Sequence, residues 1–482
     1  MTRAATFALF LLAATAGGAA AHVSERAIVL LLPTGYYRAV GVAAVVATLL
    51  LTVFLPPRAV RALFPAAPGS TLDVGAPAAG PGSALSFLIL AGLVAIGFLG
   101  PHDPLDNLLP LSLFTLWWIC MVALAAAVGN FWHWFNPWAA PLRWAFGGRH
   151  RFALPARIGQ APAILGYGLF ALYYLGDPAP ADPARLARVA AAYWGLTFAL
   201  GGLFGPGWLQ RGECFTVLFD LAGRLSPFDW RARRVRFFGR DIVSAGQVPL
   251  SLGLFCVTLL AIGSFDGLNE TFWWMAKIGI NPLAFPGRSA VVWENRIGML
   301  AAIVLLNLVL AACVWLGAAL AGARARFVAL WAASALAVLP IALAYHVAHY
   351  LTSVLVSVQY WVGALNDPLD SGAHLLGMDH TRITTSFFNR YRTERAIWLT
   401  QAGVIVAGHM LAVVLAHGVA LRHVCGPQTA GGQDPVGAQP PAQPGVQPGA
   451  HGRALRSQLF VAAFMVAYTF FGLWLLASPT AT

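Results

Sequence analysis

Runs of apolar residues long enough to cross a lipid bilayer recur along most of the chain, and they constrain the fold more than any other feature. Of the 482 residues, 59% are hydrophobic and only 10% are charged, which excludes an ordinary soluble globule. We therefore predict an all-α, polytopic transmembrane helical bundle of about ten spans, each near the length that a bilayer requires. The predicted spans are 37–55, 83–100, 110–128, 158–175, 187–204, 243–263, 297–319, 327–363, 397–421 and 457–477.

Residues 1–21 have the pattern of a cleavable secretory signal peptide. Arg3 precedes an apolar core, and small residues end the segment at Ala21. Cleavage after Ala21 would make His22 the mature N-terminus, on the periplasmic side of the membrane. An uncleaved anchor is the alternative.

The basic residues are concentrated in loops on one predicted side of the membrane. The net charge is +12, and the densest group of arginines lies within 211–240. Because cytoplasmic loops carry an excess of Arg and Lys, this asymmetry predicts a multi-pass protein of the bacterial cytoplasmic (inner) membrane with a periplasmic mature N-terminus. The placement of these charges between spans argues against a nucleic-acid partner and leaves the lipid bilayer as the expected one.

After the signal peptide we expect three parts. The transmembrane bundle covers residues 22–425, a disordered cytoplasmic linker rich in Pro, Gly and Gln covers 426–456, and a last transmembrane helix covers 457–482. Within the bundle, residues 213–228 have the pattern of an amphipathic helix lying on the membrane. The cysteines are scattered without a C-x-x-C pair, so they predict neither a disulfide framework nor a thiolate metal site.

Three histidines lie within two of the spans, where an ionisable side chain is costly unless it has a partner. His346 and His349 are one helical turn apart near the middle of 327–363, and His409 is at the middle of 397–421. If both spans are centred in the bilayer, the three rings share one depth. Three imidazoles with an open position are typical of a catalytic Zn, Fe or Cu centre, so we predict that these three residues bind a divalent transition metal.

Other interpretations of these histidines stay open. Each ring could simply hydrogen-bond across a helix interface, or His349 and His409 could bind a b-type haem from opposite sides. His417 lies about 12 Å along the helix from His409, so it cannot share one ion with it. We expect His417 to belong to a second site, to take part in a proton path or to have no chemical role. Pro340 is expected to kink the span 327–363 without ending it.

A weaker group of candidate metal ligands lies in the predicted external segments, where solvated loop residues are the default interpretation. Its members are His22, His102, Asp103 and His380. Residues 264–267 are interpreted as a turn where the chain leaves the membrane. With that turn outside the bilayer, no carboxylate lies within the histidine-bearing spans, and Tyr345 and Tyr350 are the candidate catalytic residues for moving protons.

Several short stretches of the chain, most of them around these two spans, form a recognisable set. They are 344–350 (AYHVAHY), 359–360 (QY), 367–368 (DP), 406–409 (VAGH) and 415–417 (LAH), together with 21–22 (AH) and 264–267 (SFDG). This set resembles a family of bacterial integral membrane proteins that carries the name fenitrothion hydrolase. The resemblance implies hydrolysis of an organophosphorus triester.

The function we expect is therefore a metal-dependent hydrolase of lipophilic organophosphorus triesters. A bound metal would lower the pKa of a water molecule and polarise the phosphoryl group, and a neutral aryl triester partitions into lipid. Two alternatives are a membrane redox protein that binds haem or copper, and a transporter or assembly factor for a metal or small solute.

Overall fold

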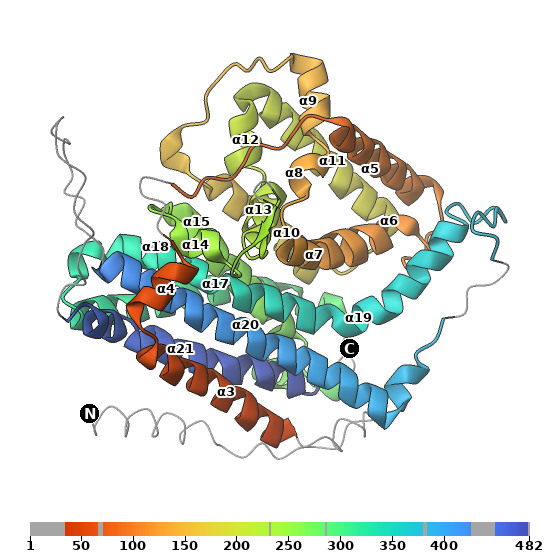
Figure 1. Ribbon diagram of the computed structural model, residues 1–482. Coiled ribbons are helices and arrows are strands. Elements are labelled where there is room, and N and C mark those ends of the chain that lie inside the picture. The colour runs from red at the N-terminus through yellow and green to blue at the C-terminus, as the bar shows by residue number, and fades with distance from the viewer. Residues whose placement is uncertain are drawn as a thin grey trace.

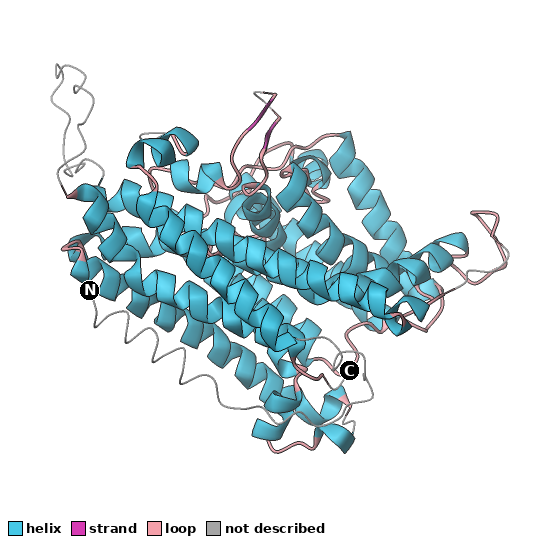
Figure 2. Ribbon diagram, turned by 60° about the horizontal axis from the view of Figure 1, so that its bottom comes forward, coloured by secondary structure: helices cyan, strands magenta, loops and turns pink. Residues whose placement is uncertain are grey.

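The computed structural model describes residues 34–65, 71–230, 233–284, 287–378, 383–425 and 449–480. In this part of the chain the protein is a bundle of helices from which one short two-stranded hairpin projects (Figures 1 and 2). The predicted signal peptide, His22, His380 and residues 426–448 of the predicted linker lie outside the described residues.

The apolar runs form helices because a helix satisfies every backbone polar group within its own segment, as lipid requires. The main helices are α3 (Thr34–Phe54), α5 (Pro81–Leu99), α10 (Ala161–Gly176), α11 (Pro183–Phe204), α15 (Leu250–Asn269), α17 (Val292–Leu320), α18 (Phe327–Ala337), α19 (Leu339–Asn366), α20 (Tyr391–Cys425) and α21 (Ala450–Ala477). One further crossing is made of three consecutive pieces, α6 (Leu108–Pro110), the π-helix η1 (Leu111–Met121) and α7 (Val122–Val128).

Shorter elements connect these helices. The short α-helices are α4 (Pro57–Leu63), α8 (Trp132–Phe135), α9 (Ala139–Phe146), α12 (Pro206–Arg211), α13 (Cys214–Gly223), α14 (Arg240–Ser244) and α16 (Phe272–Lys277). The 3₁₀ turns are η2 (Ala156–Ile158), η3 (Pro282–Ala284), η4 (Arg288–Val291), η5 (Arg324–Arg326) and η6 (Ser386–Asn389). The antiparallel hairpin pairs β1 (Phe228–Asp229) with β2 (Arg234–Val235).

Within the described residues, nine helical segments are long and apolar enough to cross a membrane. They correspond to all but one of the predicted spans. The remaining predicted span, 158–175, corresponds to α10, which has only 16 residues. The prediction of an all-α, multi-pass membrane bundle is confirmed at this level.

The helices are arranged in two groups that meet along α15 and α19 (Figure 1). In one group, α3, α20 and α21 pack against one another, and α21 also contacts α17. In the other group, α5 packs against α11, α8 and α9. Helix α15 contacts α17 and α18 of the first group and α10 of the second, whereas α19 contacts both α20 and η1. Residues on α15 and α19 therefore lie at the centre of the molecule.

Helix α13 is buried, which contradicts the prediction of an amphipathic surface helix over 213–228. Every residue from Cys214 to Ala222 is buried, and α13 contacts α7, α10 and α19. The buried carboxylate of Glu213 accepts hydrogen bonds from the backbone N–H groups of Phe215 and Thr216, at 3.0 and 2.6 Å. This cap satisfies two of the N–H groups that the first turn of a helix leaves unpaired.

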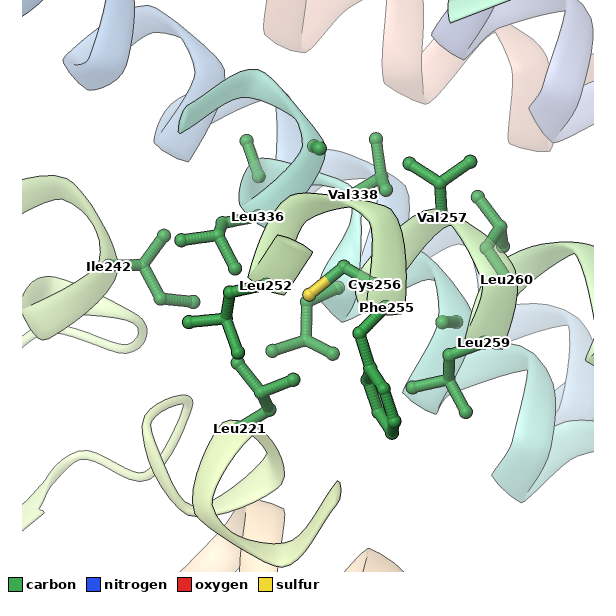
Figure 3. Close-up of a cluster of buried hydrophobic side chains, with 14 of the residues drawn as sticks. Leu221, Ile242, Leu252, Phe255, Cys256, Val257, Leu259, Leu260, Leu336 and Val338 are labelled. Carbon is green, nitrogen blue, oxygen red and sulfur yellow. The ribbon is translucent and has the colours of Figure 1, made fainter. Parts of the chain in front are cut away.

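Apolar side chains of α13 and α15 belong to one buried cluster. Leu221 points toward Leu252 and Phe255 of α15, and Ile242 of α14 and Leu336 of α18 complete the cluster (Figure 3). The polar residues Glu213, Thr216 and Asp220 recur at helical spacing, which imitates the polar face of a surface helix, but polar partners inside the bundle satisfy them: Tyr193 donates to Glu213, Asn136 donates to Thr216 and Arg224 pairs with Asp220.

Two predicted boundaries differ in the structure. The run 327–363 is divided at Val338 into α18 and α19, and Pro340 lies in the first turn of α19, where its missing N–H costs no helical hydrogen bond. The last helix begins at Ala450, so residues 450–456, which the sequence assigned to the linker, are helical.

A glycine brings α19 and α20 close together. A Cβ atom on Gly408 of α20 would lie 2.4 Å from the Cβ of Ala344 and 2.8 Å from the carbonyl oxygen of Pro340. Only a residue without a side chain fits this crossing. Gly408 therefore lies level with the first turns of α19, and His409 is the next residue of α20.

Candidate metal site at the end of α15

The candidate site begins with two carboxylates at the C-terminal end of α15. Residues 264–267 are helical and do not form the predicted exit turn, so Asp266 belongs to α15 and is only 4% exposed. Glu270 is the C-cap residue of the same helix. Because the two residues are four apart, their side chains lie on one face of the helix. The histidine-bearing spans hold no carboxylate, as predicted, but the interpretation of 264–267 as a turn outside the membrane is wrong, because α15 brings Asp266 to His349.

His349 and Tyr350 of α19 face Asp266 across the α15–α19 contact. The Nε2 atom of His349 lies 3.3 Å from Oδ2 of Asp266. The hydroxyl of Tyr350 donates a hydrogen bond to the same oxygen. A buried carboxylate is strongly destabilising unless it is paired, so these two partners account for the presence of Asp266 inside an apolar bundle.

Three ligand atoms come together at this point. One atom each from Asp266, Glu270 and His349 lie within 4.8 Å of one another. Among the residues that the structure describes, no other three Asp, Glu, His or Cys side chains approach one another this closely. One imidazole and two carboxylates form a donor set that suits a divalent transition metal such as Zn²⁺, Mn²⁺ or Fe²⁺.

A small cavity adjoins Asp266 and His349, two of the three ligand residues. Its volume is about 20 Å³, and its polar lining includes His346 and the two tyrosines 345 and 350. A buried space of this size accommodates a water molecule when two to four polar groups line it. The site therefore combines three metal-ligating groups with room for one water.

His346 lines the same cavity but faces a different helix. Its Nε2 atom lies 3.2 Å from the carbonyl oxygen of Trp118, and the two rings are 5.3 Å apart in an edge-to-face arrangement. Because a carbonyl only accepts, His346 donates from Nε2. Trp118 belongs to the π-helix η1, a form that occurs mostly as short insertions at functional sites. His346 is thus beside the three ligands and not among them.

Tyr345 holds the ring of His349 in position. The two rings stack at 5.6 Å with an interplanar angle of 11°. The hydroxyl oxygen of Tyr345 reaches so far toward α15 that a Cβ atom on Gly267 would lie 1.7 Å from it. Glycine at this position is therefore a requirement of the packing, and the Tyr345 ring is confined between α15 and His349.

His409 lies apart from His346 and His349, so the structure does not bring the three predicted ligands together. Its Nδ1 atom lies 2.8 Å from the carbonyl oxygen of Ile405 in its own helix, and its ring faces Tyr468 of α21. The prediction assumed that both spans were centred at one depth. The Gly408 crossing aligns this part of α20 with residues 340–344 of α19, within a helical turn of His346, but the His409 ring turns toward Tyr468 of α21.

The remaining predicted ligands are dispersed. His417 is buried between α20 and α21, where Nδ1 contacts the side-chain amide of Gln458. His102 and Asp103 are exposed in the turn between α5 and α6, and Asp103 accepts a hydrogen bond from the backbone N–H of Leu105. These three residues belong to no three-ligand group among the described residues.

The sequence reasoning missed Asp266 and Glu270. The available signal was a pair of acidic residues four apart at the end of an apolar run, since this spacing places both carboxylates on one helical face. Comparison with protein-family models, with curated proteins and with solved structures yields no match. The fold and the site define a multi-pass membrane protein with a partly buried cluster of one histidine and two carboxylates.

Proposed function

We propose that the protein is an integral membrane metalloenzyme that binds a divalent transition metal through Asp266, Glu270 and His349 and hydrolyses a lipophilic ester. The observation that carries the proposal is the convergence of these three ligand atoms within 4.8 Å beside a cavity with room for water. A phosphotriester is the first substrate class to test, because the resemblance to fenitrothion hydrolases suggests it.

The bound metal would supply a water molecule of lowered pKa and a Lewis acid for the phosphoryl oxygen. The side chains of the protein position these components. Asp266 and Glu270 offset the charge of a divalent ion, and the stacked ring of Tyr345 fixes the orientation of His349. Tyr350 holds a proton on its hydroxyl, directed at Oδ2 of Asp266. In the overall reaction a P–O bond to water forms, the P–O bond to the aryl group breaks, and the phenol leaves with the proton.

The surroundings of the site favour an apolar substrate. Trp118, Tyr174 and Leu259 line the cavity together with the polar groups. Glu270 and His349 are partly exposed, whereas Asp266 is buried. A ligand would therefore approach from the Glu270 side, with its apolar part against the aromatic wall.

The test is metal analysis of the full-length protein, purified in detergent without a polyhistidine tag. We expect about one equivalent of Zn²⁺ to bind at this site, and Asp266→Asn or His349→Ala to weaken binding by more than the 10- to 100-fold typical of outer-shell substitutions. His409→Ala is the matched control, since this buried histidine lies outside the cluster. If the first two variants bind Zn²⁺ as the control does, the proposed site is wrong.

Activity is tested separately on the Zn²⁺-loaded protein. We expect phenol release from a lipophilic aryl phosphotriester, and we expect this release to be lost in Asp266→Asn and retained in His409→Ala. If the protein binds stoichiometric metal but does not hydrolyse the ester, the metal site is supported and the assignment as an esterase is wrong.

A second candidate function rests on the same contacts without a metal. His349, Asp266 and Tyr350 form a continuous polar chain across the α15–α19 interface, which suits a proton relay in a transporter. This reading predicts that Zn²⁺ binding does not depend on the cluster, whereas the metalloenzyme predicts that it does. The His409 ring faces Tyr468 of α21 and not His349, so haem held between these two histidines is not part of either proposal.

A further inference from the structure

A second pair of histidines lies where α20, α21 and α3 pack together, away from Asp266. His417 of α20 is 1% exposed. His451 lies in the first turn of α21, and its Nε2 atom is 2.9 Å from the carbonyl oxygen of Val53 in α3. The two imidazole rings are 5.9 Å apart and nearly perpendicular, at 85°. Figure 1 shows α3, α20 and α21 side by side in this region.

Each of these rings has one buried nitrogen without a hydrogen-bond partner among the described residues. These atoms are Nε2 of His417 and Nδ1 of His451. The Val53 carbonyl can only accept, so His451 carries its hydrogen on Nε2, and in the neutral ring Nδ1 has a free lone pair. His417 reaches the same state when its Nδ1 donates to Oε1 of Gln458, 3.3 Å away.

Two buried lone pairs without a donor are unfavourable, because each nitrogen has lost its contact with water and gained no hydrogen bond in return. A single cation that accepts both would remove that cost. With metal–nitrogen distances of about 2.0 Å, two imidazoles on one ion have ring centroids roughly 5 to 6.5 Å apart. The observed 5.9 Å lies within this range.

We propose that His417 and His451 form a second metal site, for an imidazole-binding transition-metal ion, either Zn²⁺ or Cu⁺. The ring contact to Gln458 orients His417, and the Val53 carbonyl orients His451, in the way that outer hydrogen bonds fix the tautomer of metal-binding histidines. His451 is partly exposed, which gives an ion a route from the surface. This site is independent of the proposed function and uses none of its residues.

The experiment isolates the second site by emptying the first. The triple variant Asp266→Asn, Glu270→Gln, His349→Ala is loaded with Zn²⁺ alone or with Cu⁺ alone, desalted and analysed for metal. We expect about one equivalent with at least one of the two ions, and X-ray absorption of that sample should show imidazole scattering.

Adding His417→Gln and His451→Gln to the triple variant should abolish this equivalent, while adding His409→Gln should not. The glutamine side chains preserve hydrogen bonding, and a matched thermal midpoint shows that the fold is retained. His409 is the suitable control because it too has a buried nitrogen without a partner among the described residues, and its ring faces Tyr468.

The inference is overturned if the triple variant binds neither ion, or if the metal persists after both glutamine substitutions. These outcomes differ from failure of the proposed function. In that case the wild type and the triple variant would bind equal amounts of metal.

Discussion

The hydroxyl of Tyr350 on α19 donates a hydrogen bond to the carboxylate of Asp266 on α15. Both side chains are buried, and the contact joins the two helices at which the halves of the bundle meet. His349 approaches the same carboxylate oxygen. The position of Asp266, and with it the geometry of the candidate metal site, therefore depends on two consecutive residues of α19.

Tyr350→Phe tests this dependence with minimal change of shape. The ring keeps its contact with Trp118, 5.0 Å between centroids, but Asp266 loses a donor. We expect Zn²⁺ affinity to fall about 10- to 100-fold, as for other outer hydrogen bonds to metal ligands. Competition titration with a chromophoric chelator measures it. Tyr468→Phe, which removes a hydroxyl bonded to Ser264, is the control and should keep the wild-type affinity.

Gly267→Ala should displace Tyr345, because the new Cβ would overlap its hydroxyl oxygen. We expect a loss of about 1–3 kcal/mol in the free energy of unfolding, as for other overpacked interiors. Tyr345→Phe in the same chain removes the overlapping oxygen and should restore part of the loss. A double-mutant cycle on thermal or denaturant unfolding in detergent gives the coupling energy. Strictly additive effects would contradict the described packing.

Gly408→Ala should separate α19 from α20. Its Cβ would lie 2.4 Å from that of Ala344, so we expect destabilisation of about 1–3 kcal/mol. Gly403→Ala on the same helix is the matched control, because no atom lies within 4 Å of its added Cβ. That variant should be neutral or more stable by up to about 1 kcal/mol through helix propensity alone. Equal destabilisation of both would refute the close crossing.

Acidification should loosen the loop after α19. Backbone N–H groups of Ser371 and Gly372 donate to Asp367 and hold the pKa of its carboxyl below the usual range. The pKa of Asp367 is thus lower in the folded state than in the unfolded state, where it is about 3.9. The hydrogen bonds to its carboxylate therefore stabilise the loop fully above the unfolded-state pKa. This stabilisation is lost as the pH falls through the lower folded-state pKa.

Hydrogen exchange of the Ser371 and Gly372 amides measures this transition. Their protection factors should decrease over that acidic range in the wild type. In Asp367→Asn they should be low and independent of pH. Protection that persists in the acidic wild-type protein would show that the carboxylate does not hold the loop.

The sequence was sufficient for the architecture but only partly for the site. Long apolar runs have one stable form in lipid, so the helices α3, α5, α17 and α20 could be predicted from hydropathy. His349 was found because a histidine in such a run requires a partner. Its partner Asp266 was missed because a Ser–Phe–Asp–Gly stretch favours a turn in water, whereas packing against α19 keeps it helical.

The direction of the His409 side chain could not be predicted from the sequence. Centring both runs in the bilayer placed His409 level with His346, and Gly408 does pack on Ala344, within one turn of His346, but the His409 ring faces Tyr468 of α21. Likewise, residues 213–228 were assigned to the membrane surface because they have the pattern of an amphipathic helix. Nothing in its own residues shows that α10, α15 and α19 enclose it, because its burial depends on side chains from separate helices, of which α19 lies more than a hundred residues further along the chain.

The burial of α13 has a consequence for biogenesis. This ten-residue helix is too short to leave the translocon as an independent span, and its walls include α15 and α19, which are synthesised later. Its apolar side chains can therefore reach their final packing only after the ribosome has synthesised residue 366, where α19 ends. The halves of the bundle cannot mature one after the other: α13 couples the insertion of the first half to delivery of the second.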